Sequence, residues 1–209
     1  KGVESKLGYL HDLGITALWL SPVFKQRGHL NTFHGYGIQH FLDVDPRFGT
    51  RNDLVALVDA AHARGMRIIL DIIFNHSGFN WVYPGGAKEP VYKPFPDRYP
   101  FGSWLGRSGE EVGNHVDDHE AGVWPAEMQA IDSYTRAGVG NLGGGSLDDP
   151  NAEHKRTDFF TLRDFSLSTP GVLDHLAACY RYWIALTDCD GFRIDTLKHV
   201  SYEEGRNFC

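Results

Sequence analysis

The chain has 209 residues, a formal net charge of −7, 42% hydrophobic residues and 22% charged residues. These values are ordinary for a globular domain with its own core, and the acidic balance argues against a nucleic-acid partner. No apolar run is long enough to cross a membrane, so we expect no membrane partner. The three cysteines form no disulfide framework.

The N-terminal residues predict a helix followed by a strand. Leucines at helical spacing over residues 3–13 end at Gly14, which suits a helix terminator. The apolar run 15–20 then predicts a buried strand, and residues 25–35 predict a polar loop. No signal peptide is visible and the chain opens at Lys1 without a methionine, so we interpret it as a piece of a longer protein.

A second helix and strand follow at βαβ spacing. Thr50 is placed to cap a helix, Asp53 lies in its first turn and Gly65 ends it. The isoleucine-rich run 66–74 predicts a fully buried strand. Strand, helix and strand at this spacing predict a parallel sheet with a right-handed crossover. The apolar stripe of the helix consists of Leu54, Leu57, Val58 and Ala61.

Regular periodicity stops between residues 77 and 165. Five prolines punctuate residues 84–100, and the glycine-rich stretch 138–145 lacks the lysine and spacing of a phosphate-binding loop, so we expect no organic cofactor. A connection this long is usually functional or a small domain of its own. We therefore predict a subdomain inserted at the carboxyl side of the sheet.

The last third of the chain returns to helix and strand. Thr169 and Pro170 predict the cap and first turn of a strong helix, residues 191–195 predict a third strand, and Ser201 begins a further helix. The chain therefore predicts an α/β fold with three strand–helix units and one long insertion. A closed eight-stranded barrel needs about 250 residues, so any such barrel would be incomplete here.

The strand at 191–195 carries the chemistry. Phe192 and Ile194 alternate with Arg193 and Asp195, so the two charged side chains share one face. A carboxylate beside a guanidinium stays ionised, which suits nucleophilic attack on an anomeric carbon. The alternative is a structural ion pair, and this stretch alone leaves both interpretations open.

Four stretches, in order, resemble the motifs of the α-amylase family of glycoside hydrolases and transglycosylases. Residues 191–199 resemble its nucleophile motif, and 71–76 resemble the end of its third barrel strand. Residues 34–36, followed by 45–50, resemble the segment after its second strand, and 162–165 resemble the motif that closes its inserted domain. The resemblance implies a partial (β/α)8 TIM barrel, about strands 2 to 4, with domain B inserted after strand 3.

This resemblance implies the domain division and the catalytic pair. Residues 1–76 and 166–209 would belong to the barrel, and 77–165 to domain B. Asp195 resembles the nucleophile of a retaining enzyme, and Arg193 the residue that holds it ionised. The family's general acid, a glutamate, lies beyond the end of this chain, and Glu203 and Glu204 are too close to Asp195 to replace it. We therefore expect that this chain needs the rest of the barrel for activity.

The resemblance also implies substrate contacts. Tyr36 resembles the aromatic platform, and His76 the histidine, that bind the sugar before the cleaved bond. Lys198 and His199 resemble residues that line the leaving-group side in enzymes acting on α-1,4-linked glucans. The expected substrate is an α-glucan oligosaccharide or a disaccharide. One departure is His40, where the family commonly has an aspartate.

A calcium site is implied as well. Asn75, Asp164 and the backbone oxygen of His199 resemble the family's Ca²⁺ ligands, although several members lack the ion. Asp71 is interpreted as a supporting residue. The cluster formed by His115, Asp117, Asp118 and His119 could bind a metal on a helix, but its surroundings favour a polar loop.

Two other functions compete with a glycosidase. One is a non-catalytic carbohydrate-binding or scaffold protein with an amylase-like barrel, which the presence of Asp195 disfavours. The other is an unrelated metal-dependent barrel hydrolase, for which His76 is the only histidine placed at a strand end.

Overall fold

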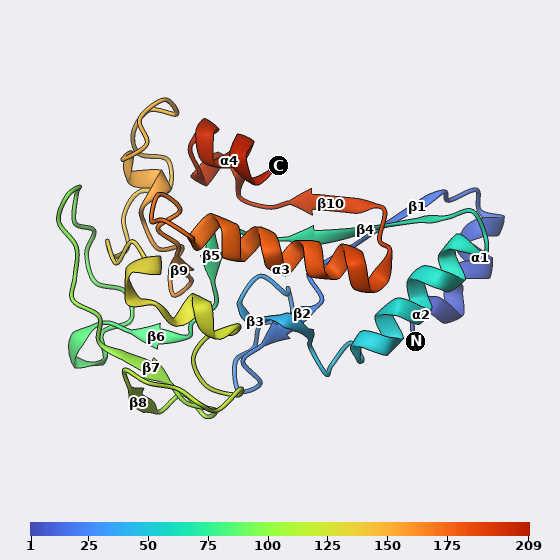
Figure 1. The fold of residues 1–209 in the computed structure, drawn as a ribbon, viewed down its shortest axis with the longest axis horizontal. Helices are drawn as coiled ribbons and strands as arrows, with labels where there is room; N and C mark the ends of the chain where they lie inside the picture. Colours follow the sequence, from blue (N-terminus) through green and yellow to red (C-terminus); the bar gives the residue numbers. More distant parts are fainter.

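The computed structural model describes residues 1–209 and has an α/β fold. The strands β1 (Ala17–Leu20), β4 (Arg67–Ile72) and β10 (Gly191–Ile194) form one parallel sheet in the order β1-β4-β10. In Figure 1, α1 and α2 lie near one end of the sheet, and the residues between β4 and α3 gather at the other end. The carboxyl ends of the three predicted strands therefore meet beside the long insertion.

Two helices cover one face of the sheet. The helix α2 (Arg51–His62) begins with a capping box in which Thr50 and Asp53 exchange hydrogen bonds, as the sequence predicts. The helix α3 (Val172–Thr187) packs through Tyr180, whose hydroxyl accepts a hydrogen bond from the Ile73 amide at 3.2 Å. At the N-terminus, the 3₁₀ turn η1 (Glu4–Lys6) leads into α1 (Leu7–Asp12).

The start of α3 differs from the prediction that Thr169 caps it. Gly171, with φ of +87°, is the residue before the helix, and its αL backbone replaces a capping side chain. The hydroxyl of Thr169 instead donates to the carbonyl of Asp132 at 3.0 Å. The predicted start was wrong because a hydrogen bond to a residue 37 positions away redirects the expected cap.

The first strand is less buried than the sequence predicts. In β1 the exposed and half-buried residues alternate, and Trp19 is 60% exposed. The reason is that β1 pairs only with β4 and is an edge strand of this sheet. An apolar run thus identified a strand correctly but not its burial.

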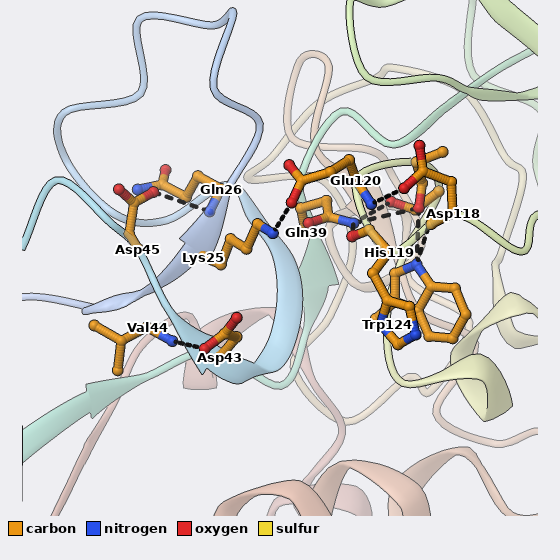
Figure 2. A network of polar contacts seen from close by, with 12 residues as sticks. Lys25, Gln26, Gln39, Asp43, Val44, Asp45, Asp118, His119, Glu120 and Trp124 are labelled. Atoms are coloured by element: carbon orange, nitrogen blue, oxygen red, sulfur yellow. Dashed lines mark hydrogen bonds and ion pairs between the residues drawn. The ribbon is translucent and has the colours of Figure 1, made fainter. Parts of the chain in front are cut away.

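A hairpin replaces part of the predicted loop at 25–35. The strand β2 (Phe24–Gln26) pairs antiparallel with β3 (Ile38–Val44), with shifts in register that leave little period-2 pattern. Figure 2 shows this hairpin joined to residues 118–124 of the insertion: Lys25 pairs with Glu120, and the Gln39 amide donates to the carbonyl of His119 at 3.1 Å. The hairpin therefore ties the sheet to the insertion.

The insertion has its own aromatic core. The carboxylate of Asp158 pairs with Arg163 at 2.7 Å, and both side chains are fully buried. The guanidinium of Arg163 lies over the ring of Trp81 at 4.7 Å, and Tyr83 donates to Asp158 at 2.7 Å. The strands here are β5 (His76–Ser77), β6 (Trp81–Val82), β7 (Ser103–Leu105), β8 (Glu111–Gly113) and β9 (Arg163–Asp164). The 3₁₀ turns are η2 (Pro84–Gly86), η3 (Ala126–Gln129), η4 (Ile131–Ser133) and η5 (Glu153–Lys155).

The chain closes with the 3₁₀ turn η6 (Leu197–His199) and the helix α4 (Tyr202–Phe208). Ser201 and Glu204 form a capping box at the start of α4, which confirms the helix predicted from Ser201. The longest helix, α3, has 16 residues, and none of the helices combines the length and apolar character needed to cross a bilayer.

Candidate active site

An ion pair lies at the carboxyl end of β10. Arg193 points to the same side of the strand as Asp195, and its Nη1 donates to Asp195 Oδ1 at 2.7 Å. The amide of Asp195 donates to the carbonyl of Ile72 at 2.9 Å, which fixes the backbone just beyond the strand. Thr196 follows with φ of +56°, an unusual conformation for a β-branched residue. The alternation of the sequence thus places the carboxylate at the edge of the sheet.

A cavity of about 780 Å³ opens at this edge, and Tyr36, His76 and Asp195 all line it. One wall comes from residues 30–37, between β2 and β3, and the other from residues 159–162 of the insertion. Asp195 is the only carboxylate among the lining residues. The fold therefore brings three predicted site residues from separate parts of the sequence around one space large enough for a small ligand.

His76 is buried beside this carboxylate. Its Nδ1 lies 3.1 Å from Asn75 Oδ1, while its Nε2 is buried and has no hydrogen-bond partner within the chain. Burial lowers the pKa of His76 to about 4, although the charge of Asp195 acts in the opposite direction. The imidazole is therefore neutral near pH 7 and retains one nitrogen free to bond a ligand.

Tyr36 forms part of an aromatic wall. Its ring stacks on His34 with centroids 5.7 Å apart and an interplanar angle of 17°. Its hydroxyl donates to Asp71 Oδ2 at 3.1 Å, and burial raises its pKa. An aromatic face held this way at a cavity wall suits the apolar face of a sugar ring.

Lys198 and the ring of His199 do not line the cavity. The turn η6 carries them away from Asp195: Lys198 is exposed, and the Nδ1 of His199 lies 2.8 Å from the carbonyl of His154. That Lys198 and His199 line the leaving-group side of the site stays a prediction, since this cavity is bounded by other residues.

Asn75, Asp164 and the carbonyl of His199 converge as the calcium motif implies. The amide nitrogen of Asn75 lies 2.8 Å from Asp164 Oδ1 and 3.3 Å from the His199 oxygen. Asp164 Oδ2 is buried with no hydrogen-bond partner, and burial raises the pKa of Asp164 well above its usual value. A buried carboxylate oxygen without a donor, beside an amide and a carbonyl, fits the donor set of a hard cation.

The other metal candidate is not assembled. The ring of His119 stacks on Trp124 at 3.9 Å, whereas His115 is exposed and pairs with Asp117 at 3.0 Å. No group of three or more His, Cys, Asp or Glu residues is arranged to hold a metal ion in the chain. The polar loop favoured by the sequence is what the structure shows.

Several residues of the site were missed at the level of sequence. Phe159 lies 6.4 Å from the ring of His76, and Phe160, with φ of +57°, lines the cavity while 59% exposed. An αL backbone is uncommon for a residue other than glycine, which makes Phe160 a candidate for a role in the cavity. The adjacent phenylalanines in a polar stretch were the available signal. His34, which also lines the cavity, belongs to the motif 34–36 but was not itself predicted as a site residue.

The fold and the site together define an α/β protein with a ligand cavity at the carboxyl ends of parallel strands, where a paired carboxylate meets aromatic and polar side chains. The family model "Alpha amylase, catalytic domain" matches residues 1–207. The chain therefore belongs to the α-amylase family.

Three similar proteins illustrate the match. An α-amylase of Streptomyces lividans is 33% identical over 97% of this chain and 24% of that protein. A trehalose synthase/amylase of Mycobacterium tuberculosis is 30% identical over 99% of this chain and 30% of that protein. A crystal structure of an Anoxybacillus α-amylase superposes with a TM-score of 0.68 at 27% identity, over 99% of this chain and 35% of that one. The chain thus spans about a quarter to a third of the length of these relatives.

Proposed function

We propose that this chain is part of the catalytic domain of a retaining glycoside hydrolase or transglycosylase acting on α-glucans, with Asp195 as the nucleophile. One observation carries the proposal: Asp195, held by Arg193 at 2.7 Å, lines the same cavity as the Tyr36 ring and the neutral His76. The similarity to an α-amylase and to a trehalose synthase/amylase supports an α-glucan or related carbohydrate as the substrate.

The chemistry assigned to Asp195 is a double displacement. The hydrogen bond from Arg193 occupies Oδ1, and Oδ2 makes no hydrogen bond within the chain, so Oδ2 is the attacking atom. Its electron pair forms a bond to the anomeric carbon while the glycosidic C–O bond breaks, and the departing oxygen takes a proton from a carboxylic acid. Water, or a sugar hydroxyl in transfer, then attacks the same carbon and gives its proton to the carboxylate left by the acid, and the bond to Asp195 breaks with overall retention of configuration.

Tyr36 and His76 bind and orient the sugar in this proposal. The Tyr36 ring supports its apolar face, and the free Nε2 of His76 bonds a hydroxyl. Asp195 is the only carboxylate that lines the cavity, so the proposal takes the general acid from outside this chain, and the family resemblance implies that it is a glutamate. Accordingly, β1, β4 and β10 would be strands 2 to 4 of a (β/α)8 barrel, and residues 77–165 its domain B.

Calcium is the proposed ion for Asn75, Asp164 and the His199 carbonyl. Asn75 directly precedes β5, Asp164 lies on β9, and His199 lies in η6. When bound there, the ion would supply a charge partner for the buried Asp164 and would tie the insertion to the sheet. It would not touch the reacting atoms, since none of the three is a residue of the cavity wall.

The test is the variant Asp195→Asn in the full-length protein. Loss of the nucleophile should lower turnover of maltooligosaccharides by at least about a thousandfold, with little change in melting temperature. Mass spectrometry should locate the label from an activated fluorosugar on Asp195. The matched control is Asp188→Asn, the same substitution three residues before β10, where the carboxylate is 94% exposed and the αL backbone tolerates asparagine. Near-normal turnover of Asp195→Asn contradicts the proposal and favours a carbohydrate-binding or unrelated role.

A further inference from the structure

Trp19 lies on the face of the sheet that carries Asp71 and Arg193. Its ring centre is 5.0 Å from the guanidinium carbon of Arg193, within the range of a cation–π contact. Its indole Nε1 donates to Asp71 Oδ2 at 3.1 Å. Trp19 does not line the cavity that contains Asp195, so it has no direct route to a ligand there.

Asp71 gathers the hydrogen bonds of this face. Its side chain is fully buried, and Nη1 of Arg193 donates to Oδ1 at 3.0 Å and to Oδ2 at 3.1 Å. Oδ2 also accepts from Trp19 and from the Tyr36 hydroxyl, each at 3.1 Å. Burial raises the pKa of Asp71, and the bonds from Arg193, Trp19 and Tyr36 oppose that shift. The carboxylate is therefore fixed by three donors from three separate segments.

Arg193 is shared between two carboxylates through one nitrogen. Its Nη1 contacts Asp71 and also donates to Asp195 Oδ1 at 2.7 Å, so the position of Asp71 decides where that nitrogen points. The arginine side chain is 37% exposed, and no other hydrogen bond of its guanidinium within the chain restrains it. Only the indole ring and the two carboxylates hold it in place.

We propose that Trp19 is a positioning residue for Asp195 and acts through Asp71 and Arg193. The indole N–H fixes Oδ2 of Asp71, one of the two oxygens that Arg193 bonds, and the indole ring covers the guanidinium, which keeps its Nη1 directed at Asp195. This inference rests on the proposed function of Asp195. Since Trp19 does not line the cavity that contains Asp195, its loss changes the chemical step and leaves substrate binding there nearly unaltered.

The experiment uses two substitutions in the full-length protein. Trp19→Phe keeps an aromatic face over Arg193 and removes the N–H, whereas Trp19→Leu removes both. Because a hydrogen bond to a charged group is lost, kcat of Trp19→Phe should fall by roughly tenfold, and that of Trp19→Leu should fall further. KM for maltooligosaccharides should stay within about twofold of the original for both variants. The control is Tyr9→Leu, which removes an exposed aromatic of α1 that does not line the cavity and should leave kcat and KM unchanged.

A double-mutant cycle tests the route through Asp71. If Trp19 acts through Asp71, then Trp19→Phe should add nothing to the loss of kcat caused by Asp71→Asn, whereas independent effects would multiply. Melting temperatures of all variants are measured, and Trp19→Phe supplies the result if Trp19→Leu does not fold. Three results overturn the inference, provided that Asp195→Asn is inactive. They are a normal kcat for Trp19→Phe, a rise in KM in place of a fall in kcat, and losses of kcat that multiply in the double variant. Turnover retained by Asp195→Asn overturns the proposed function and this inference with it.

Discussion

We predict that His40 makes the free energy of unfolding of the protein fall as the pH is lowered. Burial lowers the pKa of His40 from 6.5 to about 4, and nearby Lys25, His119 and Arg51 act in the same direction, against Asp43. Its Nδ1 lies 3.2 Å from the Leu42 amide and so accepts a hydrogen bond that only the neutral ring can take. The folded protein therefore disfavours protonation of His40.

The sign and size of the effect follow from the two pKa values. Between pH 6.5 and 4 the unfolded chain binds more protons at this residue than the folded chain, so the free energy of unfolding falls as the pH falls. The contribution is fully present above pH 6.5 and fully lost below pH 4. A shift from 6.5 to about 4 corresponds to a loss of about 3 kcal/mol across this window.

The variant His40→Asn isolates this contribution. The asparagine carbonyl can accept from the Leu42 amide without titrating, so the variant loses ring contacts at every pH but lacks the pH-dependent part. Equilibrium unfolding in urea at pH 7 and pH 4 should show that the advantage of the original protein over His40→Asn shrinks by about 3 kcal/mol on acidification. An NMR titration of the His40 ring should have its midpoint near 4. A midpoint near 6.5, or equal pH slopes for both proteins, would refute the reasoning.

Two further predictions concern the ion and the completeness of the site. If Asn75, Asp164 and the His199 carbonyl bind calcium, chelation should lower the melting temperature of the full-length protein, because an ion that binds only the folded state stabilises it by about 2.7 kcal/mol at a hundred times its Kd. Asp164→Ala should abolish that response, and a melting temperature that ignores chelator in the original protein counts against the ion. Residues 1–209 expressed alone should not cleave maltooligosaccharides above the level of their own Asp195→Asn variant, since no second carboxylate lines the cavity. Turnover clearly above that variant would show that this chain supplies its own acid.

The sequence by itself determined the main helices and the strands of the parallel sheet, and it placed Arg193 beside Asp195. The helix after Thr50 and the helix after Ser201 are fixed by capping boxes, which need only residues three apart. The alternation along β10 placed Arg193 and Asp195 on one side of a strand, because successive side chains point to opposite faces. Matches to the family motifs added Tyr36 and His76, which the structure brings to one cavity.

The tertiary structure decided burial, charge state and the outline of the cavity. In the folded chain Trp19 is 60% exposed and lies over the guanidinium of Arg193. Burial lowers the pKa of His76 so that its ring is neutral, and Lys198 does not line the cavity. The hydrogen bond between Arg193 and Asp71 joins residues 122 positions apart, and no local pattern reports such a pair. Periodicity and capping act within one or two turns of chain, whereas desolvation and cross-strand contacts depend on segments that meet only when the sheet and the insertion are packed together.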